Sequence, residues 1–225
     1  MSENTTPHKA SEYDGKVSQV IPGYGLFHEQ IIDLIRCYNS TPGVWLDTGC
    51  GTGSLVLKAY KRFVDTSFIL ADPSASMLKI AKEKLAGEKR VRFLDPAGTQ
   101  ELALPENSTD VVTAVMSHHY LDNGGRKKAT ANCFRMLKKG GLFITFENIR
   151  PSTEEGIQIG LERWKKFQTG QGRSEEEAKK HLARFDAEFF PVTIGEHLNL
   201  LRETGFKAAE ILWASYMQAG FYAIK

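Results

Sequence analysis

The segment at residues 44–55, VWLDTGCGTGSL, constrains the fold more than any other part of the chain. A short apolar run meets Asp47, and Gly49, Gly51 and Gly53 then alternate with small residues before a helical pattern begins. Glycines in such a turn permit positive φ angles and let a ligand approach the backbone without a Cβ in between. The helix that follows adds unpaired N–H groups and a partial positive charge. The segment therefore predicts a strand, a ligand-binding turn and a helix.

Strand and helix patterns alternate through the first two thirds of the chain. Each predicted strand is a short apolar run, and each predicted helix has apolar residues at helical spacing. Such alternation predicts an α/β fold with a parallel sheet and right-handed crossovers. The predicted strands cover residues 44–47, 67–71, 91–94, 111–116 and 142–146, and the predicted helices 13–38 (with a break at 21–24), 54–63, 75–85 and 126–137, the last ended by Lys-Lys-Gly-Gly at 138–141.

The regular alternation stops after the fifth strand. Residues 152–187 are rich in Glu, Lys and Arg and predict two helices with a Thr-Gly-Gln-Gly break at 169–172. A further helix is expected from Thr193, which suits the N-cap, to a stop at Gly205. Two final strands, at 206–213 and 217–224, predict a terminal β-hairpin.

Length and composition limit the class of protein. A chain of 225 residues, 41% hydrophobic and 25% charged, suits one soluble α/β domain with an insertion. With 29 Lys and Arg against 27 Asp and Glu, the net charge of +2 gives no reason to expect a nucleic-acid or membrane partner. Cys37, Cys50 and Cys133 lack metal-ligand spacing, and no run of about 18 apolar residues occurs. We expect a cytoplasmic monomer or homodimer without a metal site.

Polar residues follow the predicted strands. Asp47, Asp72 and the segments 95–100, 117–119 and 147–148 each lie just beyond a strand end. In open parallel sheets ligands bind outside the carboxyl ends of the strands. These segments are therefore expected to converge on one ligand site.

These segments together resemble the class I S-adenosylmethionine (SAM)-dependent methyltransferases. The resemblance extends over residues 44–225 and rests on residues 46–53 (LDTGCGTG), 72–78 (DPSASML), 110–112 (DVV) and 137–141 (LKKGG). It implies a Rossmann-like three-layer sandwich, with a seven-stranded, mostly parallel sheet that ends in an antiparallel hairpin. It also implies transfer of a methyl group from SAM, by SN2 displacement, to a nucleophile on a small-molecule acceptor. Most of the catalysis can then come from positioning and water exclusion.

The resemblance also assigns cofactor contacts. Asp47 and the glycines would hold the methionine part of SAM, and Asp72 the ribose, because one carboxylate suits two vicinal hydroxyl donors. For the adenine two alternatives stay open: Asp95, or the segment Gly98-Thr99-Gln100, which the spacing from Asp110 favours. The complete expected set comprises Tyr24, Asp47, Gly49, Gly51, Gly53, Asp72, Pro73, Ser74, Met77, Asp95, Gly98, Thr99, Gln100 and Ser117.

His118 and His119 follow the fourth predicted strand and are the candidate catalytic residues. A histidine with a pKa near 6.5 can accept a proton from an acceptor group. Alternatively, one of the pair is a buried structural histidine. The expected substrate contacts are Glu147, Asn148, Arg150 and Trp164. A surface ion pair is the alternative for Arg150, and a core position, which the pattern favours, is the alternative for Trp164.

The N-terminal segment and the insertion give the expected domain organisation, and two alternative functions stay open. Residues 1–40 are expected to form a helical lid on a methyltransferase domain at 41–225, with the insertion at 152–190 as a substrate cover. Ile21-Pro22-Gly23-Tyr24 resembles the N-terminal region of carboxy-S-adenosylmethionine synthases, which carboxylate SAM for tRNA wobble-uridine modification. The chain could therefore be such a synthase or a tRNA-modifying relative. A third alternative is a cofactor-binding scaffold without turnover.

Overall fold

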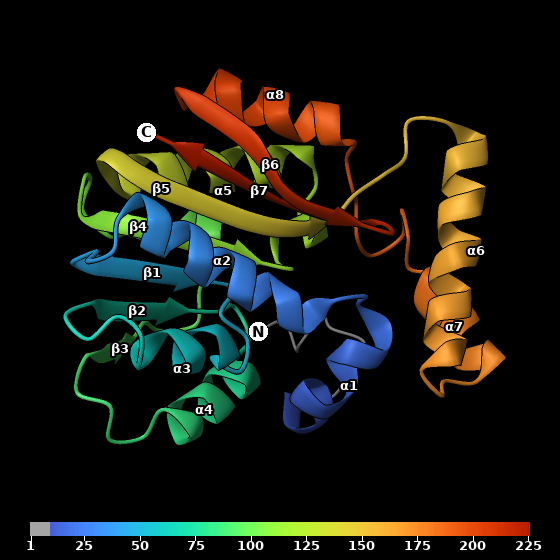
Figure 1. Ribbon diagram of the computed structural model, residues 1–225, viewed down its shortest axis with the longest axis horizontal. Helices are drawn as coiled ribbons and strands as arrows, with labels where there is room; N and C mark the ends of the chain where they lie inside the picture. The colour runs from blue at the N-terminus through green and yellow to red at the C-terminus, as the bar shows by residue number, and fades with distance from the viewer. Residues whose placement is uncertain (1–9) are drawn as a thin grey trace.

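The computed structural model describes residues 10–225 and is built around a seven-stranded sheet (Figure 1). The strand order is β3-β2-β1-β4-β5-β7-β6. The first five strands pair in parallel, and β7 pairs antiparallel with both β5 and β6. The α/β prediction and the C-terminal hairpin are therefore confirmed. The strands are β1 (Val44–Thr48), β2 (Ser67–Ala71), β3 (Val91–Phe93), β4 (Thr109–Val115), β5 (Leu137–Asn148), β6 (Ala208–Ser215) and β7 (Gln218–Ile224).

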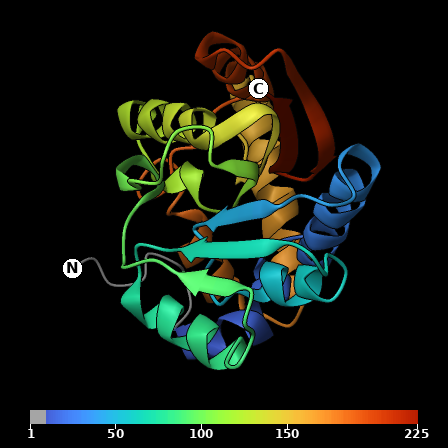
Figure 2. The same ribbon diagram turned by 90° about the vertical axis from the view of Figure 1, so that its left-hand side faces the viewer.

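Helices cover both faces of the sheet, which gives three layers. One apolar cluster joins α2 and α3 to the sheet, and a second joins α5 and α8 to its other face. Figure 2 shows α2 and α3 on one side of the strands and α5 on the other. The helices are α1 (Tyr13–Val20), α2 (Tyr24–Tyr38), α3 (Ser54–Tyr60), α4 (Ala75–Lys84), α5 (Asn123–Met136), α6 (Glu154–Gly170), α7 (Glu175–Leu182) and α8 (Ile194–Thr204), with short 3-10 helices η1 (Ala10–Glu12), η2 (Thr99–Glu101) and η3 (His118–Tyr120).

The strand register brings the polar strand ends together. Thr48, the last residue of β1, lies beside Ala71 of β2 and Ala114 of β4. The chain beyond each of these three strands therefore emerges at the same edge of the sheet. This edge receives the glycine turn, Asp72 and the segment after β4, as expected for a doubly wound sheet.

The predicted helix end at residues 138–141 is wrong. Helix α5 ends at Met136, and β5 begins at Leu137, five residues earlier than expected. Leu137 pairs with Thr109 of β4, and the register then shifts before Val111 pairs with Leu142. Gly140, with φ of 78°, lies within this irregular stretch. Pairing with β4 extends β5 to Leu137, and the local Lys-Lys-Gly-Gly pattern contains no information about this pairing.

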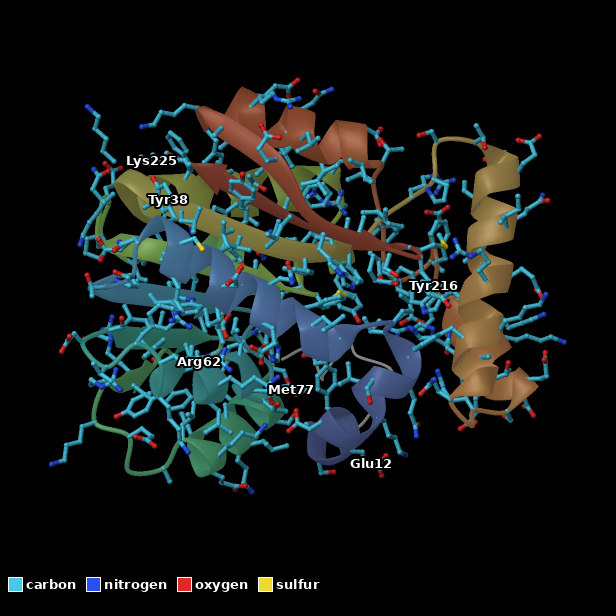
Figure 3. The ribbon with its side chains drawn as sticks, viewed as in Figure 1. Glu12, Tyr38, Arg62, Met77, Tyr216 and Lys225 are labelled. Carbon is cyan, nitrogen blue, oxygen red and sulfur yellow. The ribbon has the colours of Figure 1, made fainter. Side chains whose placement is uncertain are left out.

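The N-terminal helices and the insertion lie against each other. Gly23, with φ of 68°, separates α1 from α2, as the predicted break required. Helices α6 and α7 pack together at one end of the molecule, and α6 also contacts α1 (Figure 1). Trp164 of α6 is buried, and its Nε1 donates to the Val20 carbonyl at 2.6 Å. At the far end of α2, the Tyr38 hydroxyl donates to the Gly140 carbonyl at 2.8 Å (Figure 3).

Among residues 10–225, none of the helices combines the length and the hydropathy needed to span a bilayer.

Candidate functional site

The glycine turn between β1 and α3 adopts a backbone that favours glycine. Gly49, Gly51 and Gly53 have φ angles of 65°, 54° and 74°. A Cβ on Gly49 would lie 2.4 Å from the Ser117 Cβ, so the turn and the segment after β4 approach closely. Gly53 precedes α3, and a Cβ there would lie 3.1 Å from Leu85 of the chain after α4. Gly53 therefore serves packing, whereas Gly49 and Gly51 border a cavity.

Asp72, directly after β2, bonds to the glycine turn. Its Oδ2 accepts from the Gly51 N–H at 2.8 Å, and its Oδ1 accepts from the Ser74 N–H at 2.8 Å. Burial raises the pKa of this carboxyl, and the two N–H donors oppose that rise. Each carboxylate oxygen has a second lone pair, so Asp72 can still accept hydrogen bonds from a ligand. Ser74 then caps α4 by accepting from the Met77 N–H at 3.3 Å.

The main cavity, of about 340 Å³, lies at this edge of the sheet. Met77, on α4, borders it (Figure 3). Two side-chain oxygens at its wall, Gln100 Oε1 and Ser117 Oγ, are buried and have no partner among the described residues. Buried polar atoms are normally bonded, so both are available to a ligand. The main cavity is lined by Tyr13, Gly49, Gly51, Asp72, Pro73, Ser74, Met77, Gly98, Thr99, Gln100, Glu101, Val115, Met116, Ser117, His118, Tyr120 and Leu121.

A second space, the Asp47 cavity, adjoins the main cavity through shared lining residues. It measures about 30 Å³. Asp47 Oδ1 accepts from the Thr113 hydroxyl at 2.7 Å, while Oδ2 has no partner in the described part of the chain. Burial, with a smaller contribution from Asp72, raises the pKa of Asp47 to about 7. The lining residues are Tyr13, Tyr24, His28, Asp47, Gly49, Cys50, Gly51, Thr52, Ser54, Leu55 and Val115.

A third space, the His119 cavity, measures about 20 Å³, enough for one water-sized group. It shares Tyr13, Met116 and Tyr120 with the main cavity. None of its lining residues is Lys or Arg, although the Arg184 guanidinium packs over the rings of two of them, Tyr120 and Phe189. The lining residues are Tyr13, Val17, Val20, Ile21, Met116, His119, Tyr120, Asn148, His181 and Phe189.

His119 is held by a buried carboxylate. Glu147 Oε2 accepts from the His119 N–H and lies 2.8 Å from His119 Nδ1. Although burial raises the pKa of Glu147, hydrogen bonds and charge from His119, with His118 and Thr145, lower it to about 2. The ionised carboxylate only accepts hydrogen bonds, so Nδ1 carries the hydrogen and Nε2 is the basic nitrogen of the neutral ring. This is a histidine–carboxylate dyad.

His118 occupies a different environment. Its Nε2 lies 3.1 Å from the Thr99 hydroxyl, which in turn lies 2.7 Å from the Thr48 hydroxyl. Burial lowers the pKa of His118, which keeps the ring neutral. His118 borders the main cavity, whereas His119 borders the His119 cavity.

Helix α1 borders the three cavities. Tyr13 lines all of them. The next residue, Asp14, accepts hydrogen bonds from Thr52 at 2.7 Å and Ser54 at 2.9 Å, and forms an ion pair with Lys84 of α4. Burial raises the pKa of Asp14, but these three partners outweigh it and the pKa is lowered. Asp14 therefore fastens α1 to the glycine turn and to α4.

The structure places several predicted site residues away from these cavities. Asp95 is exposed, while Gly98, Thr99 and Gln100 line the main cavity. Arg150 pairs with Asp186 and Glu154. Of the predicted contacts, the following line none of the three cavities: Gly53, Asp95, Glu147, Arg150 and Trp164.

The sequence reasoning missed His28, Met116, Tyr120 and His181 as cavity residues. For His28 a signal existed, because it lies one helical turn beyond Tyr24 and therefore on the same face of α2. The other three reach the cavities through tertiary packing, for which the sequence offers no local pattern. In residues 10–225, no group of three or more His, Cys, Asp or Glu side chains is arranged to hold a metal ion.

The main cavity and the Asp47 cavity share lining residues and present polar atoms that the parts of SAM would need. The main cavity has a two-oxygen acceptor in Asp72 and unpartnered polar atoms in Gln100 and Ser117, which suit a nucleoside. The Asp47 cavity has an unpartnered carboxylate oxygen, which suits an ammonium group. At Gly49, which borders both cavities, a Cβ would collide with the Ser117 side chain. These features have the hydrogen-bonding chemistry that the predicted cofactor requires.

Comparisons with known proteins show a methyltransferase domain and a similar fold. Residues 46–141 match the family model described as "Methyltransferase domain". A carboxy-S-adenosyl-L-methionine synthase from Hydrogenovibrio crunogenus is 29% identical over 93% of this chain and 84% of its own. A SAM-dependent methyltransferase from Aquifex aeolicus superposes with a TM-score of 0.64 and 16% identity, over 97% and 98% of the two chains. An N-methyltransferase from Haemonchus contortus in complex with S-adenosylhomocysteine has a TM-score of 0.67 and 15% identity, over 98% and 59%.

Proposed function

We propose that the chain is a class I SAM-dependent methyltransferase and that it transfers a methyl group from SAM to a nucleophile on a small-molecule acceptor. The match of residues 46–141 to a methyltransferase domain and the Rossmann-like sheet support this assignment. The observation that carries the proposal is the His119 cavity, a small space that adjoins the main cavity and has a candidate base in its wall. When bound, SAM supplies an electrophilic methyl group that an in-line SN2 attack can remove.

Residues of the main cavity would hold the nucleoside. Asp72 would accept hydrogen bonds from the ribose hydroxyls, and Gly98, Thr99 and Gln100 would line the adenine. His118 bonds Thr99, so its role would be to position this wall rather than to accept a proton. Of the two candidate catalytic histidines, we therefore propose only His119 as the base.

His119 would act on the acceptor. Glu147 fixes the ring with Nδ1–H toward the carboxylate, which leaves Nε2 able to accept a proton. Glu147 is therefore proposed as a positioning residue and not as a substrate contact. Asn148 would contact the acceptor group, because it lines the same cavity. With neutral lining and a volume of about 20 Å³, the cavity suits a neutral hydroxyl or amine.

The helices around the site would exclude water from it. Tyr13 of α1 lines all three cavities, which supports a covering role for the N-terminal helices, although the segment before residue 10 lies outside the described residues. The insertion contributes His181 and Phe189 to the His119 cavity, which supports its proposed role as a substrate cover. Exclusion of water favours a displacement that hydrolysis would otherwise compete with.

A second function is carboxylation of SAM, as in the relative from Hydrogenovibrio crunogenus named a carboxy-S-adenosyl-L-methionine synthase. The similarity extends over nearly the whole chain, which favours this alternative. A carboxylate beside the methyl group would be stabilised by Lys or Arg. The His119 cavity has neither among its lining residues, so we favour methyl transfer.

Mass spectrometry of the products distinguishes these functions. The purified protein is incubated with SAM and fractions of a small-molecule extract, and S-adenosylhomocysteine and carboxylated SAM are both quantified. Methyl transfer predicts S-adenosylhomocysteine that depends on a fraction and is lost in His119→Asn but kept in His197→Asn, a change at a buried histidine that borders none of the three cavities. Carboxylated SAM without S-adenosylhomocysteine would establish the second function. Binding of SAM without either product would indicate a scaffold.

A further inference from the structure

His28, on α2, is a buried histidine with an unsatisfied ring nitrogen. Its side chain is 3% exposed, and Nδ1 has no hydrogen-bond partner among the described residues. The ring packs against Tyr24, with centroids 5.3 Å apart. Buried polar atoms without partners are rare, and a bound ligand is one of the few reasons for their persistence. His28 borders the Asp47 cavity, where such a ligand can lie.

Asp47, in the wall of the same cavity, presents a second unsatisfied atom. Thr113 accepts from Trp45 Nε1 at 2.9 Å and donates to Asp47 Oδ1 at 2.7 Å, which fixes the carboxyl and leaves Oδ2 unbonded within residues 10–225. Asp47 Oδ2 can only accept a hydrogen bond when ionised, whereas a neutral imidazole can donate from Nδ1. The cavity therefore combines a carboxyl oxygen, which accepts once Asp47 is ionised, with a potential donor.

We propose that His28 Nδ1–H binds the α-carboxylate of the cofactor, beside Asp47, which is already expected to hold the methionine part of SAM. This inference rests on the proposed cofactor site and adds His28 as the residue that recognises the α-carboxylate. The volume of about 30 Å³ has room for about two water-sized groups, which matches one ammonium and one carboxylate. Other ionisable groups act on His28 from a distance, namely Lys58, Glu29, Asp14 and Lys84. Burial outweighs these groups and lowers the pKa of His28 to about 4, so the ring is neutral and can donate from Nδ1.

Two ligands that differ only at this end provide the test. S-adenosylhomocysteine carries the zwitterion, whereas methylthioadenosine has the same nucleoside and a thioether without it. Both are titrated calorimetrically against the unsubstituted protein, His28→Leu and His28→Asn. Leucine removes the donor at similar size, and the asparagine amide places a donor close to the position of Nδ1. His197→Leu is the matched control, because His197 is also 3% exposed with an unpartnered nitrogen and borders none of the three cavities.

We expect His28→Leu to weaken S-adenosylhomocysteine about tenfold, the loss of one charge-assisted hydrogen bond, and to change methylthioadenosine less than about twofold. His28→Asn should recover most of the affinity, and His197→Leu should leave both affinities intact. Unchanged S-adenosylhomocysteine binding in His28→Leu, or equal weakening of both ligands, would overturn the inference. Failure of both ligands to bind the unsubstituted protein would instead overturn the cofactor site itself, and the inference with it.

Discussion

Glu147→Gln tests the dyad that holds His119. In the structure one carboxylate oxygen faces the N–H and Nδ1 of His119, and the other faces the Thr145 hydroxyl and the His118 N–H. A glutamine presents an oxygen to only one of these pairs, so its NH₂ group must oppose donors on the other side. The substitution therefore leaves buried donors without an acceptor and removes the charge that fixes the tautomer of His119.

The expected cost follows from the buried contacts of Glu147. Its lowered pKa, about 2 against an ordinary 4.5, gives the sign of the cost, and the loss of a charged acceptor from buried donors gives its size, about 1–3 kcal/mol at neutral pH. Because the folded-state pKa is depressed, this stabilisation is fully present above the ordinary pKa and is lost as the pH falls from about 4.5 toward 2. The difference in unfolding free energy between the two proteins should accordingly be about 1–3 kcal/mol at pH 7 and shrink below pH 5.

Urea unfolding at several pH values measures this difference, with Glu203→Gln as the control, because Glu203 is an exposed residue of α8. We expect the control to stay within about 0.5 kcal/mol of the unsubstituted protein at every pH. A cost for Glu147→Gln below about 1 kcal/mol at pH 7, or a cost that does not change with pH, would refute the assignment of Glu147 as an ionised, fully bonded carboxylate.

Three further substitutions test the cofactor site and its cover. Asp72→Ala should weaken S-adenosylhomocysteine at least about tenfold by calorimetry, since a bidentate charged acceptor is lost; unchanged affinity would exclude the ribose role. Gly49→Ala places a Cβ 2.4 Å from the Ser117 Cβ at a φ of 65°, and should cost about 1–3 kcal/mol in thermal unfolding; unaltered stability would contradict the close approach. Asp14→Asn removes the half-exposed ion pair with Lys84 that helps to hold α1 in place. Because such a pair is only weakly stabilising, we expect S-adenosylhomocysteine to dissociate only about threefold faster in stopped-flow measurements; an unchanged rate would show that α1 does not cover the ligand.

The local patterns that the sequence contains were sufficient for much of the fold. The apolar runs at residues 44–48 and 67–71 became buried parallel strands, because such strands are covered on both faces. Thr193 and Gly205 cap α8 as expected, since both act through their own backbone neighbours. The strand ends met at one edge because parallel strands align their carboxyl ends. Asp72 could be located because its position depends only on the length of one helix and one strand.

Contacts between distant segments could not be predicted from the sequence. Glu147 was expected to face a substrate, but it bonds His119, 28 residues away, because the pairing of β5 beside β4 turns its side chain there. The irregular start of β5 at Leu137 likewise depended on Thr109 of the neighbouring strand. The sequence by itself determined which segments form strands and helices and which polar residues follow each strand, since backbone preference and periodicity are local properties. Only the tertiary structure decided which side chains face the cavities, as with Tyr13 and His28, because side-chain direction is fixed by packing between elements that are far apart in sequence.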